Sequence, residues 1–555
     1  MTPKPRSHRR LIALVAVLAL AAAGCGGGDD DDTTAPESSG SSTTAEVSPQ
    51  GDPVRGGSIT VGIEAETNSW LPGSANFSNA GINVALAIYD PLFRRDADGV
   101  LHPYLAEKMA VSDDLTEWTV TLRSGVKFHD GTPLTAQAMK TTFDTYINAT
   151  GSNLAGQVKD VQSVTAVDEL TLLYTLAAPN AAFGDVLAGA VGWAFSPTAA
   201  ASGPDAGSHP VGTGPFLFGD WQRDSKLVLT RNPDYWQEGL PYLDEIVFRP
   251  IPDEDTRISS LKTGDVDAVQ SLRQSAIRQL QDLDGVDTYE FLGNNSGSAI
   301  FNTSVAPLDD VRVRRALAYA LDQDQLIEVL GGTGITPAET QYFSEDSPYY
   351  SEAVAAAWPT GDAEEAAKLI DEYVNDPERS DGKAVGDPVT FTFDCPPDPS
   401  LIELSQLYQA FWGGIGVEVD LNQVEQATHV SEAIAGDYQA KCWRVGDQGD
   451  PYRTFTDAFT ADSPLNFTRF SHPRIDEALD VLRTTADNEA RKAAVEDISM
   501  VLAEEVPNTF TAATLSVLAV QENVKNVDGW TFPDGTKGEG VPGATTMWGH
   551  VWLAE

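Results

Sequence analysis

Basic residues are scarce in this chain. Its 555 residues hold 36 lysines and arginines against 82 acidic residues, which gives a net charge of −46. Such a chain repels phosphate backbones and anionic lipid headgroups, so we expect no nucleic-acid partner. Charge alone does not separate a salty habitat from a preference for cationic ligands. Beyond residue 25 no apolar run reaches the roughly 20 residues that span a bilayer, which predicts a soluble, globular body.

Sequence signatures of catalysis are also missing. The chain has no Gly-x-Ser-x-Gly elbow, no His-Glu-x-x-His, no Cys-x-x-Cys and no phosphate-binding loop. Its histidines are scattered, with no two at ligand spacing on one helix; they are His8, His102, His129, His209, His429, His472 and His550. We therefore expect no enzyme, no catalytic residue, no metal and no cofactor.

The first 25 residues have the parts of a secretory signal. Lys4 and three arginines precede an uncharged apolar run over 11–23, which is too short to cross a bilayer. Cys25 follows at once, which resembles the bacterial lipobox, whose cysteine is lipidated and becomes the mature N-terminus. Ala22 stands where such signals usually carry Leu, and an uncleaved anchor helix is the alternative. We predict a lipoprotein signal over 1–25 that anchors the chain through Cys25 to the outer face of the cell membrane.

The next segment, 26–50, is rich in Gly, Ser, Thr and Asp and has almost no large apolar residue. It cannot bury enough surface to offset the entropy of ordering. We expect a disordered tether, in which the acidic run 29–32 is a solvated stretch rather than a cation site.

Two cysteines remain besides Cys25. Cys395 and Cys442 form an even pair in a chain expected to be exported, which favours a disulfide. Both follow strand-like runs, over 389–394 and 438–441, that could be neighbours in one sheet. Two buried free thiols are the alternative.

Strand-like and helix-like patterns are mixed along the body. Apolar residues alternate as in strands over 58–63, 118–123, 169–174 and 226–230. Helical spacing predicts helices over 135–146, with Thr135 as N-cap, and over 311–330, 475–482 and 490–502. The mixture indicates an α/β fold.

Several phrases stand in a fixed order along this body. They are LRSGVKFHDGTPLTA (122–136), VGTGPF (211–216), LTRNPDYW (229–236), DEDTRISSLKTGDVD (253–267) and PLDDVRVRRALAYALD (307–322), with Asp447 and Asp450-Pro451 late in the chain. In order and spacing they resemble the extracellular solute-binding proteins of family 5, the oligopeptide, dipeptide and nickel class that serves ABC transporters.

The resemblance implies a bilobal periplasmic-binding-protein fold, with the ligand in a cleft between two hinged lobes. Lobe I is expected at 51–88, 210–298 and 519–555, an inserted subdomain at 89–209, and lobe II at 299–518. Chain crossings near Asn294 and Val520 would form the hinge. We expect a monomer.

The resemblance also suggests ligand contacts in lobe II. In peptide-binding members a loop acid pairs with the ligand's α-ammonium, and counting back from Asp450-Pro451 places Asp447 there. A carboxylate suits a desolvated ammonium, because such a charge-assisted bond contributes roughly 1.5–3 kcal/mol. Arg444 holds the family's Trp position, with Trp443 one place earlier, so Arg444 could receive a carboxylate or phosphate. The alternative for Asp447 is a turn residue that caps its own loop.

Five further candidates have weaker signals. Glu64, Trp70 and Asn79 follow the first strand, in loops where the family lines its cleft. Trp193 and Tyr452 are aromatic candidates, since rings supply contact area at low entropy cost. Residues of these types are more often packing or surface positions than ligand contacts.

The implied function is capture of an extracytoplasmic solute, an oligopeptide first, and its delivery to an ABC permease for import. An oligosaccharide or a metal chelate is the alternative ligand, and sugar is the stronger of the two because histidines are few. An exported hydrolase is the least favoured function.

Overall fold

The computed structural model describes residues 51–555 except Asn76, Thr150, Gly151, Asn153, Asp346, Asp398, Asp447 and Gln448. The predicted signal, Cys25, the tether 26–50 and the ligand candidate Asp447 lie outside the described residues. Residues 52–555 form one compact unit. In the part of the chain that is described, no helix combines the length and apolar character needed to cross a membrane.

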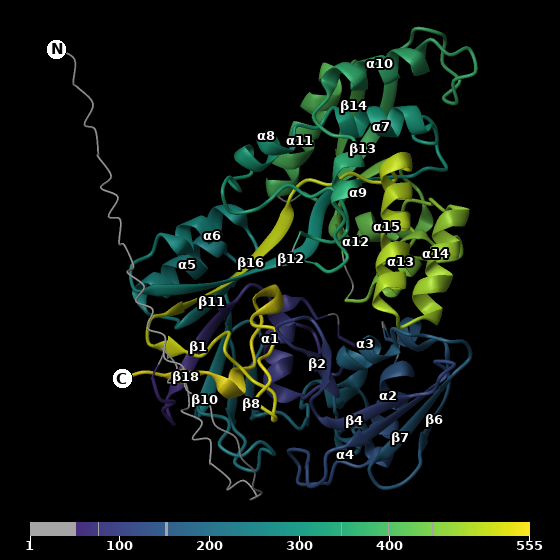
Figure 1. The fold of residues 1–555 in the computed structure, drawn as a ribbon. Coiled ribbons are helices and arrows are strands. Elements are labelled where there is room, and N and C mark those ends of the chain that lie inside the picture. Colours follow the sequence, from purple (N-terminus) through teal and green to yellow (C-terminus); the bar gives the residue numbers. More distant parts are fainter. Residues whose placement is uncertain are drawn as a thin grey trace, which may run out of the picture. The chain divides into compact units, whose positions relative to one another are not determined.

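A ten-stranded mixed sheet runs through this unit (Figure 1). Its central strands β12 and β16 are antiparallel, whereas β1 is parallel to β10 and β13 is parallel to β14 and β15. In spatial order the strands are β14 (Val417–Gln423), β13 (Val389–Cys395), β15 (Ala440–Gly446), β12 (Val286–Phe301), β16 (Ala513–Gln521), β11 (Ala268–Ser271), β1 (Ser58–Ile63), β10 (Glu245–Pro250), β9 (Lys226–Arg231) and β8 (Phe216–Gln222).

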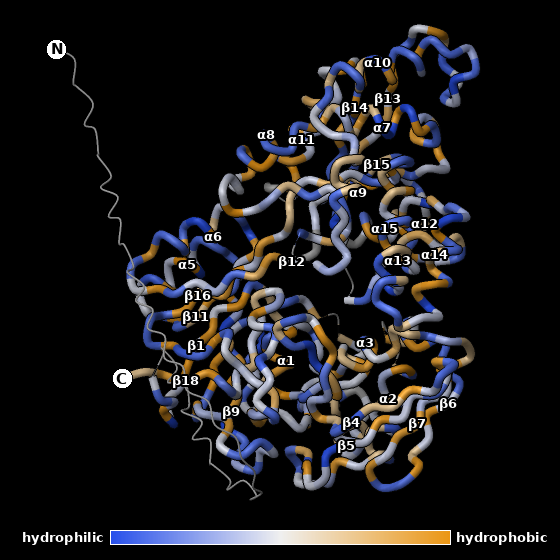
Figure 2. Tube along the Cα trace, in the orientation of Figure 1, coloured by the Kyte–Doolittle hydropathy of each residue, from blue (hydrophilic) through white to orange (hydrophobic). Residues whose placement is uncertain are grey.

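Smaller sheets complete the strand content. A four-stranded sheet has the order β4 (Ala106–Val111), β5 (Glu117–Leu122), β7 (Thr171–Leu176) and β6 (Val161–Ala166). Two-stranded pairs join β2 (Phe93–Arg95) to β3 (Leu101–Pro103) and β17 (Val524–Lys525) to β18 (Trp552–Leu553). Buried and less buried positions alternate along β5 and β7. This period of two is why the sequence signals these strands. Figure 2 shows hydrophobic and hydrophilic residues interspersed along the elements of the unit.

The helices lie between and around the strands. In chain order they are α1 (Asn79–Ile88), α2 (Ala136–Ile147), α3 (Phe183–Ala188), α4 (Pro197–Ala200), α5 (Glu254–Thr263), α6 (Gln274–Gln281), α7 (Val311–Tyr319), α8 (Gln323–Val329), α9 (Glu352–Ala357), α10 (Ala363–Val374), α11 (Pro399–Gly414), α12 (Gln426–Ala435), α13 (Pro451–Phe459), α14 (Pro473–Thr484) and α15 (Asn488–Glu505). The predicted cap is confirmed, because the Thr135 hydroxyl accepts from the Ala138 amide at 3.1 Å.

The prediction of one helix over 311–330 is wrong. The segment forms α7 and α8, separated at Ala320–Asp322. The Asp322 side chain accepts from the Gln325 amide and so begins a new helix. The Leu321 carbonyl accepts from the Gly361 amide at 2.9 Å instead of continuing the helix. A capping residue and a tertiary hydrogen bond therefore end the first helix, although apolar residues continue at helical spacing.

Two large hydrophobic clusters form the core. One draws its buried residues from 59–268 and 518–551, and the other from 299–510. We use "inserted subdomain" for 89–209 and "second lobe" for 299–518, the ranges predicted above, which remain predictions. β12 extends from one cluster to the other, and its pairing with β16 shifts register between Gly293 and Ser296. The hinge positions also remain a prediction.

One family phrase has a clear structural role. Asp90, fully buried, accepts from the Tyr235 hydroxyl at 3.0 Å and from the Trp236 indole at 2.8 Å. Burial raises the pKa of the Asp90 carboxyl to about 7, although these hydrogen bonds act in the opposite direction. The Gly214 backbone lies against Ile88, two residues before Asp90, since a Cβ at Gly214 would lie 2.5 Å from the Ile88 carbonyl carbon. The phrase 229–236 therefore fastens Asp90, at the start of the inserted subdomain, through Tyr235 and Trp236.

Candidate ligand-binding site

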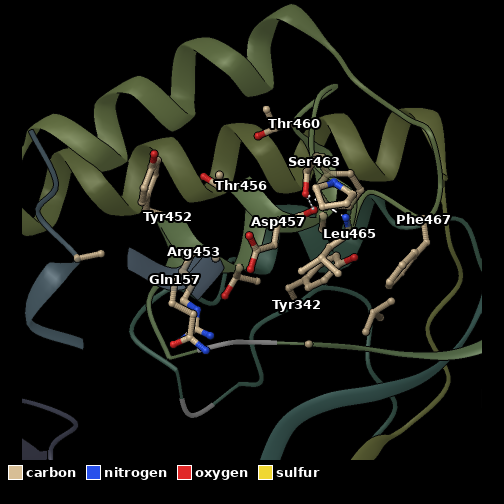
Figure 3. Close-up of a pocket in the computed structure, with 18 of the residues that line it drawn as sticks. Gln157, Tyr342, Tyr452, Arg453, Thr456, Asp457, Thr460, Ser463, Leu465 and Phe467 are labelled. Atoms are coloured by element: carbon tan, nitrogen blue, oxygen red, sulfur yellow. Dashed lines mark hydrogen bonds between the residues drawn. The ribbon is translucent and has the colours of Figure 1, made fainter. Parts of the chain in front are cut away.

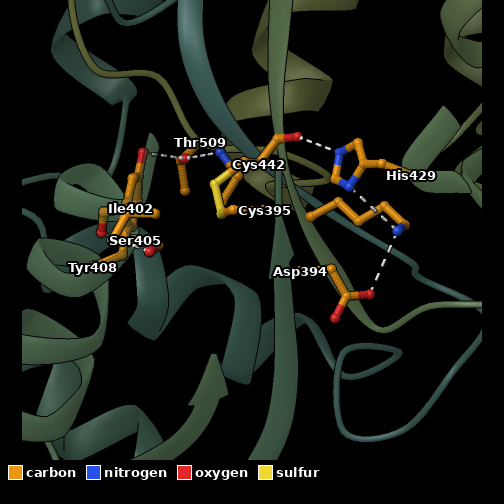
Figure 4. Close-up of a disulfide and its surroundings, with 10 residues drawn as sticks. Asp394, Cys395, Ile402, Ser405, Tyr408, His429, Cys442 and Thr509 are labelled. Atoms are coloured by element: carbon orange, nitrogen blue, oxygen red, sulfur yellow. Dashed lines mark hydrogen bonds and ion pairs between the residues drawn. A yellow bond between two sulfur atoms is a disulfide. The ribbon is translucent and has the colours of Figure 1, made fainter. Parts of the chain in front are cut away.

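The predicted disulfide joins Cys395 and Cys442 (Figure 4). β13 and β15 are parallel neighbours, with Phe393 opposite Ala440 and Asp394 opposite Lys441. This register brings the two cysteines opposite each other, with their Cα atoms 5.0 Å apart. The prediction from the two strand-like runs is confirmed.

A buried polar cluster lies beside this disulfide. The Lys441 ammonium is inaccessible to solvent and lies 2.9 Å from a Glu432 oxygen and 3.4 Å from an Asp394 oxygen. His429 contacts the same strand, since its Nε2 is 3.0 Å from the Cys442 carbonyl and its Nδ1 is 3.5 Å from Lys441 Nζ. Burial lowers the pKa of His429. A neutral imidazole that donates from Nε2 and accepts at Nδ1 satisfies both contacts.

Trp443, the next residue of β15, lies between two rings. Its indole stacks on His429, with ring centroids 5.5 Å apart, and packs against Phe467 at 4.7 Å. The disulfide and the buried cluster hold the strand on its N-terminal side. The Trp443 indole is therefore a fixed wall, and it lines a cavity together with Arg444.

This cavity has a volume of about 510 Å³ (Figure 3). One wall comes from the second lobe: β15, α13 and the segment 460–468, with Tyr342 and Ile300. The other wall comes from the inserted subdomain: Gly156, Gln157, Lys159, Asp160, Asn180, Ala182 and Val186. A site built from two parts of the chain can enclose a ligand when they approach each other.

Helix α13 presents five polar residues to the cavity from the second-lobe wall: Tyr452, Arg453, Thr454, Thr456 and Asp457. Asp450 caps this helix by accepting from the Tyr452 amide at 2.8 Å, and its carboxylate also pairs with the buried Arg491. The helix start is thereby fixed in the core. Figure 3 shows Tyr452, Arg453, Thr456 and Asp457 extending from it.

Asp457 is a cavity residue that the sequence did not single out. Burial raises the pKa of its carboxyl, although the charges of Arg453 and Lys159 act in the opposite direction. No hydrogen bond joins this carboxyl to a described residue. In a chain with 82 acidic residues an aspartate on a helix gives no distinctive signal. Only the cavity around it marks it as a candidate.

The structure brings three of the predicted residues together. Trp443, Arg444 and Tyr452 line the cavity, whereas Asp447 lies outside the described residues. The other four described candidates are not among the residues that line the cavity; they are Glu64, Trp70, Asn79 and Trp193. The indoles of Trp70 and Trp193 pack in the core with exposed fractions of 1% and 5%, and Trp193 stacks on Tyr89.

The two polar candidates near β1, Glu64 and Asn79, are only partly buried. Glu64 directly follows β1, whereas Asn79 begins helix α1 rather than lying in a loop. The Asn79 amide packs against Gly543, where an added Cβ would lie 2.7 Å away. Apolar packing accounts for the two indoles and a close backbone approach for Asn79, so the proposal below uses only the cavity residues.

Comparison with known proteins decides the family. Residues 100–467 match the model of the bacterial extracellular solute-binding proteins, family 5. The chain belongs to this family. The fold is therefore the bilobal α/β fold that the sequence predicted. Family 5 proteins are extracytoplasmic solute-binding proteins that work with ABC permeases.

Relatives and solved structures extend this result. The glutathione-binding protein GsiB of Shigella flexneri is 32% identical over 281 residues, which cover 49% of this chain and 55% of that protein. The protein of the same name from Pectobacterium atrosepticum is 34% identical over 258 residues, 46% of this chain and 50% of that protein. The chain thus spans about half the length of the curated relatives it matches.

Solved structures match nearly the whole chain. AppA from Bacillus subtilis, in complex with a nonapeptide, has a TM-score of 0.73 at 21% identity and covers 91% of this chain and 100% of its own. NikZ from Campylobacter jejuni, in complex with Ni(L-His), has a TM-score of 0.72 at 21% identity, with coverages of 88% and 97%. At these identities the likeness shows the fold alone.

Proposed function

We propose that this chain is a lipid-tethered extracytoplasmic protein that captures a short peptide in the cavity beside α13 and delivers it to an ABC permease. One observation carries the proposal. The cavity combines cationic and anionic side chains with a fixed indole, and its two walls come from different parts of the chain. The family membership supplies the transport role.

The chemistry of the lining suits a zwitterionic peptide. Arg444 and Lys159 can receive carboxylates, and Asp457 can receive an ammonium, the role that the sequence predicts for Asp447 as well. Trp443 and Phe467 offer apolar contact area to the rest of the ligand. A volume of about 510 Å³ is within the range of small-ligand sites and fits a few amino-acid residues rather than a long chain.

Two relatives are named for glutathione, a tripeptide with two carboxylates and one ammonium. The mixed charges of this cavity match those groups, so glutathione is our first candidate among short peptides. A stacked sugar on Trp443 is the alternative, and a metal chelate is a third.

Two measurements test the proposal. Mass spectrometry of the solute that co-purifies with the full-length protein identifies the ligand class directly. Calorimetric titration with glutathione, with trialanine and with a maltooligosaccharide then ranks the candidates. Binding of the sugar without either peptide would overturn the peptide proposal, and turnover of any of them would overturn the binding role.

A further inference from the structure

Charged side chains from both walls meet at one end of the cavity. Helix α13 contributes Arg453 and Asp457, and the inserted subdomain contributes Lys159 and Asp160. Arg453 and Asp457 are four residues apart, which places them on one face of the helix, and Figure 3 shows both extending from the same side of α13. We call Lys159, Asp160, Arg453 and Asp457 the charged end of the cavity.

Electrostatic interactions connect these residues with one another. Burial raises the pKa of the Asp457 carboxyl, and the positive charges of Arg453 and Lys159 oppose this rise. Burial also raises the pKa of the Tyr452 hydroxyl, and the negative charges of Asp160 and Asp457 add to it. The charged end therefore brings cationic and anionic groups of both walls close together.

Two groups of the charged end are available to a ligand. The Asp457 carboxyl is partly buried and accepts no hydrogen bond from a described residue. Lys159 follows the short 3-10 helix over 155–158, its side chain is exposed, and it forms no ion pair with a described residue. A ligand that brings an ammonium to Asp457 and a carboxylate to Lys159 gives each group a partner of opposite charge.

From this arrangement we propose that the charged end binds an α-amino-acid head group, whose single α-carbon carries both an ammonium and a carboxylate, and that the chain therefore selects γ-glutamyl peptides. Asp457 accepts from the ammonium, and Lys159 donates to the carboxylate. Glutathione has this head group, because its glutamate is linked through the side-chain carboxyl. An extended tripeptide with ordinary linkages holds its ammonium and its terminal carboxylate roughly 10 Å apart, so only one of its ends fits the charged end.

Arg444 is available for the second carboxylate of such a peptide. It lines the cavity from β15, whereas the cations that act on the Asp457 carboxyl are Arg453 and Lys159. The glycine carboxylate of glutathione lies at the opposite end of the ligand from the glutamate head group. The cavity thus offers separate cations to the two carboxylates.

This inference rests on the proposed function, because it takes the cavity as the peptide site. Its test compares two isomers by calorimetric titration of the full-length protein. One is S-methylglutathione, whose blocked thiol cannot exchange with the Cys395–Cys442 disulfide, and the other is the same tripeptide with its glutamate linked through the α-carboxyl. The isomers have the same atoms and charges and differ in the position of one carboxylate. Wild type should bind the γ-linked isomer about fivefold to tenfold more tightly.

Two variants separate the roles of the charges. Lys159→Ala should weaken binding of the γ-linked isomer by about fivefold and leave the α-linked isomer unchanged, because only the γ-linked isomer places its carboxylate beside Lys159. Asp457→Asn should weaken both isomers, because both carry the ammonium. Lys140→Ala and Asp476→Asn each remove one charge outside the cavity lining, so they are the matched controls and should bind as wild type does.

Equal affinities of wild type for the two isomers overturn the inference and leave capture of short peptides intact. An equal loss for both isomers in Lys159→Ala, or no loss for either, also overturns it. Trialanine completes the set of probes. If it binds and neither isomer does, the head-group site alone is wrong; if no peptide binds wild type, the proposed function fails together with this inference. Because Lys159 is exposed, its variant carries the test if Asp457→Asn does not fold.

Discussion

Trp443 and His429 stack with their ring planes 22° apart and their centroids 5.5 Å apart. His429 has an exposed fraction of only 1%, so it supports the indole from the protein side. Removal of the imidazole would leave the indole free to turn away from the cavity. The aromatic wall of the site thus depends on a residue behind it.

His429→Ala should weaken binding of the peptide probe by about threefold to tenfold, because ordering of Trp443 must then come from the ligand. His429→Gln, which can still donate to the Cys442 carbonyl, should recover part of the loss. Calorimetric titration gives the affinity, and tryptophan fluorescence reports the environment of the indole. The control is His209→Ala, since His209 is exposed. Equal affinity of wild type and His429→Ala would remove His429 from the site.

Asp447→Ala should reduce affinity for a free-amine peptide by more than tenfold, because a desolvated ammonium would lose its carboxylate. An N-acetylated peptide should be indifferent to the change. Calorimetric titration of both peptides against both proteins makes the comparison. If wild type binds the free and the acetylated peptide equally, Asp447 does not bind an ammonium.

Asp457→Asn should also weaken binding of a free-amine peptide, and it should flatten the pH dependence of the affinity. The raised pKa of Asp457 means that the wild-type carboxylate takes up its proton at a higher pH than an ordinary aspartate does. Affinity for a cationic group is therefore present above this pKa and lost as the pH falls through it. Asp462→Asn is the matched control on the same cavity wall. The same pH profile in wild type and Asp457→Asn would contradict the assignment.

Glu339→Gln should stabilise the protein at alkaline pH. Burial, with a smaller contribution from the charge of Glu345, raises the pKa of the Glu339 carboxyl to about 8. The proton is bound more tightly in the folded state, so its stabilising contribution is full below the unfolded pKa near 4.5 and is lost as the pH rises through about 8. The difference in unfolding free energy between variant and wild type should grow by about 2–4 kcal/mol from pH 5 to pH 9.

Thermal unfolding at several pH values measures this difference. Glu328→Gln is the control, because it removes an exposed acid from α8. It shows how much stability comes merely from lowering the net negative charge, as distinct from the titration of Glu339. A constant difference across the pH range would show that Glu339 titrates as an ordinary glutamate.

Cys25→Ala should abolish incorporation of a labelled lipid precursor and release the protein from the membrane fraction. The reason is chemical, since a thioether to the lipid requires the thiol. Cys395→Ser and Cys442→Ser in the same strain should keep the label. Labelling of the Cys25→Ala protein would show that the membrane anchor lies elsewhere.

The sequence by itself determined the features that depend on neighbouring residues in the chain, such as strands and helix caps. Period-two runs located β1, β5, β7 and β9, Thr135 marked the start of α2, and the strand-like runs before Cys395 and Cys442 led to their pairing. The ordered phrases led to the family, and one of them fastens a joint, where Tyr235 and Trp236 donate to Asp90.

Tertiary structure decided the rest. The break between α7 and α8 required the Gly361 amide, which is remote in sequence from Leu321. A tryptophan looks the same in a sequence whether it lines a cavity, as Trp443 does, or fills a core, as Trp70 and Trp193 do, since burial depends on neighbours brought from elsewhere. Asp457 and Lys159 became site candidates only because folding places α13 and the inserted subdomain on facing walls of one cavity.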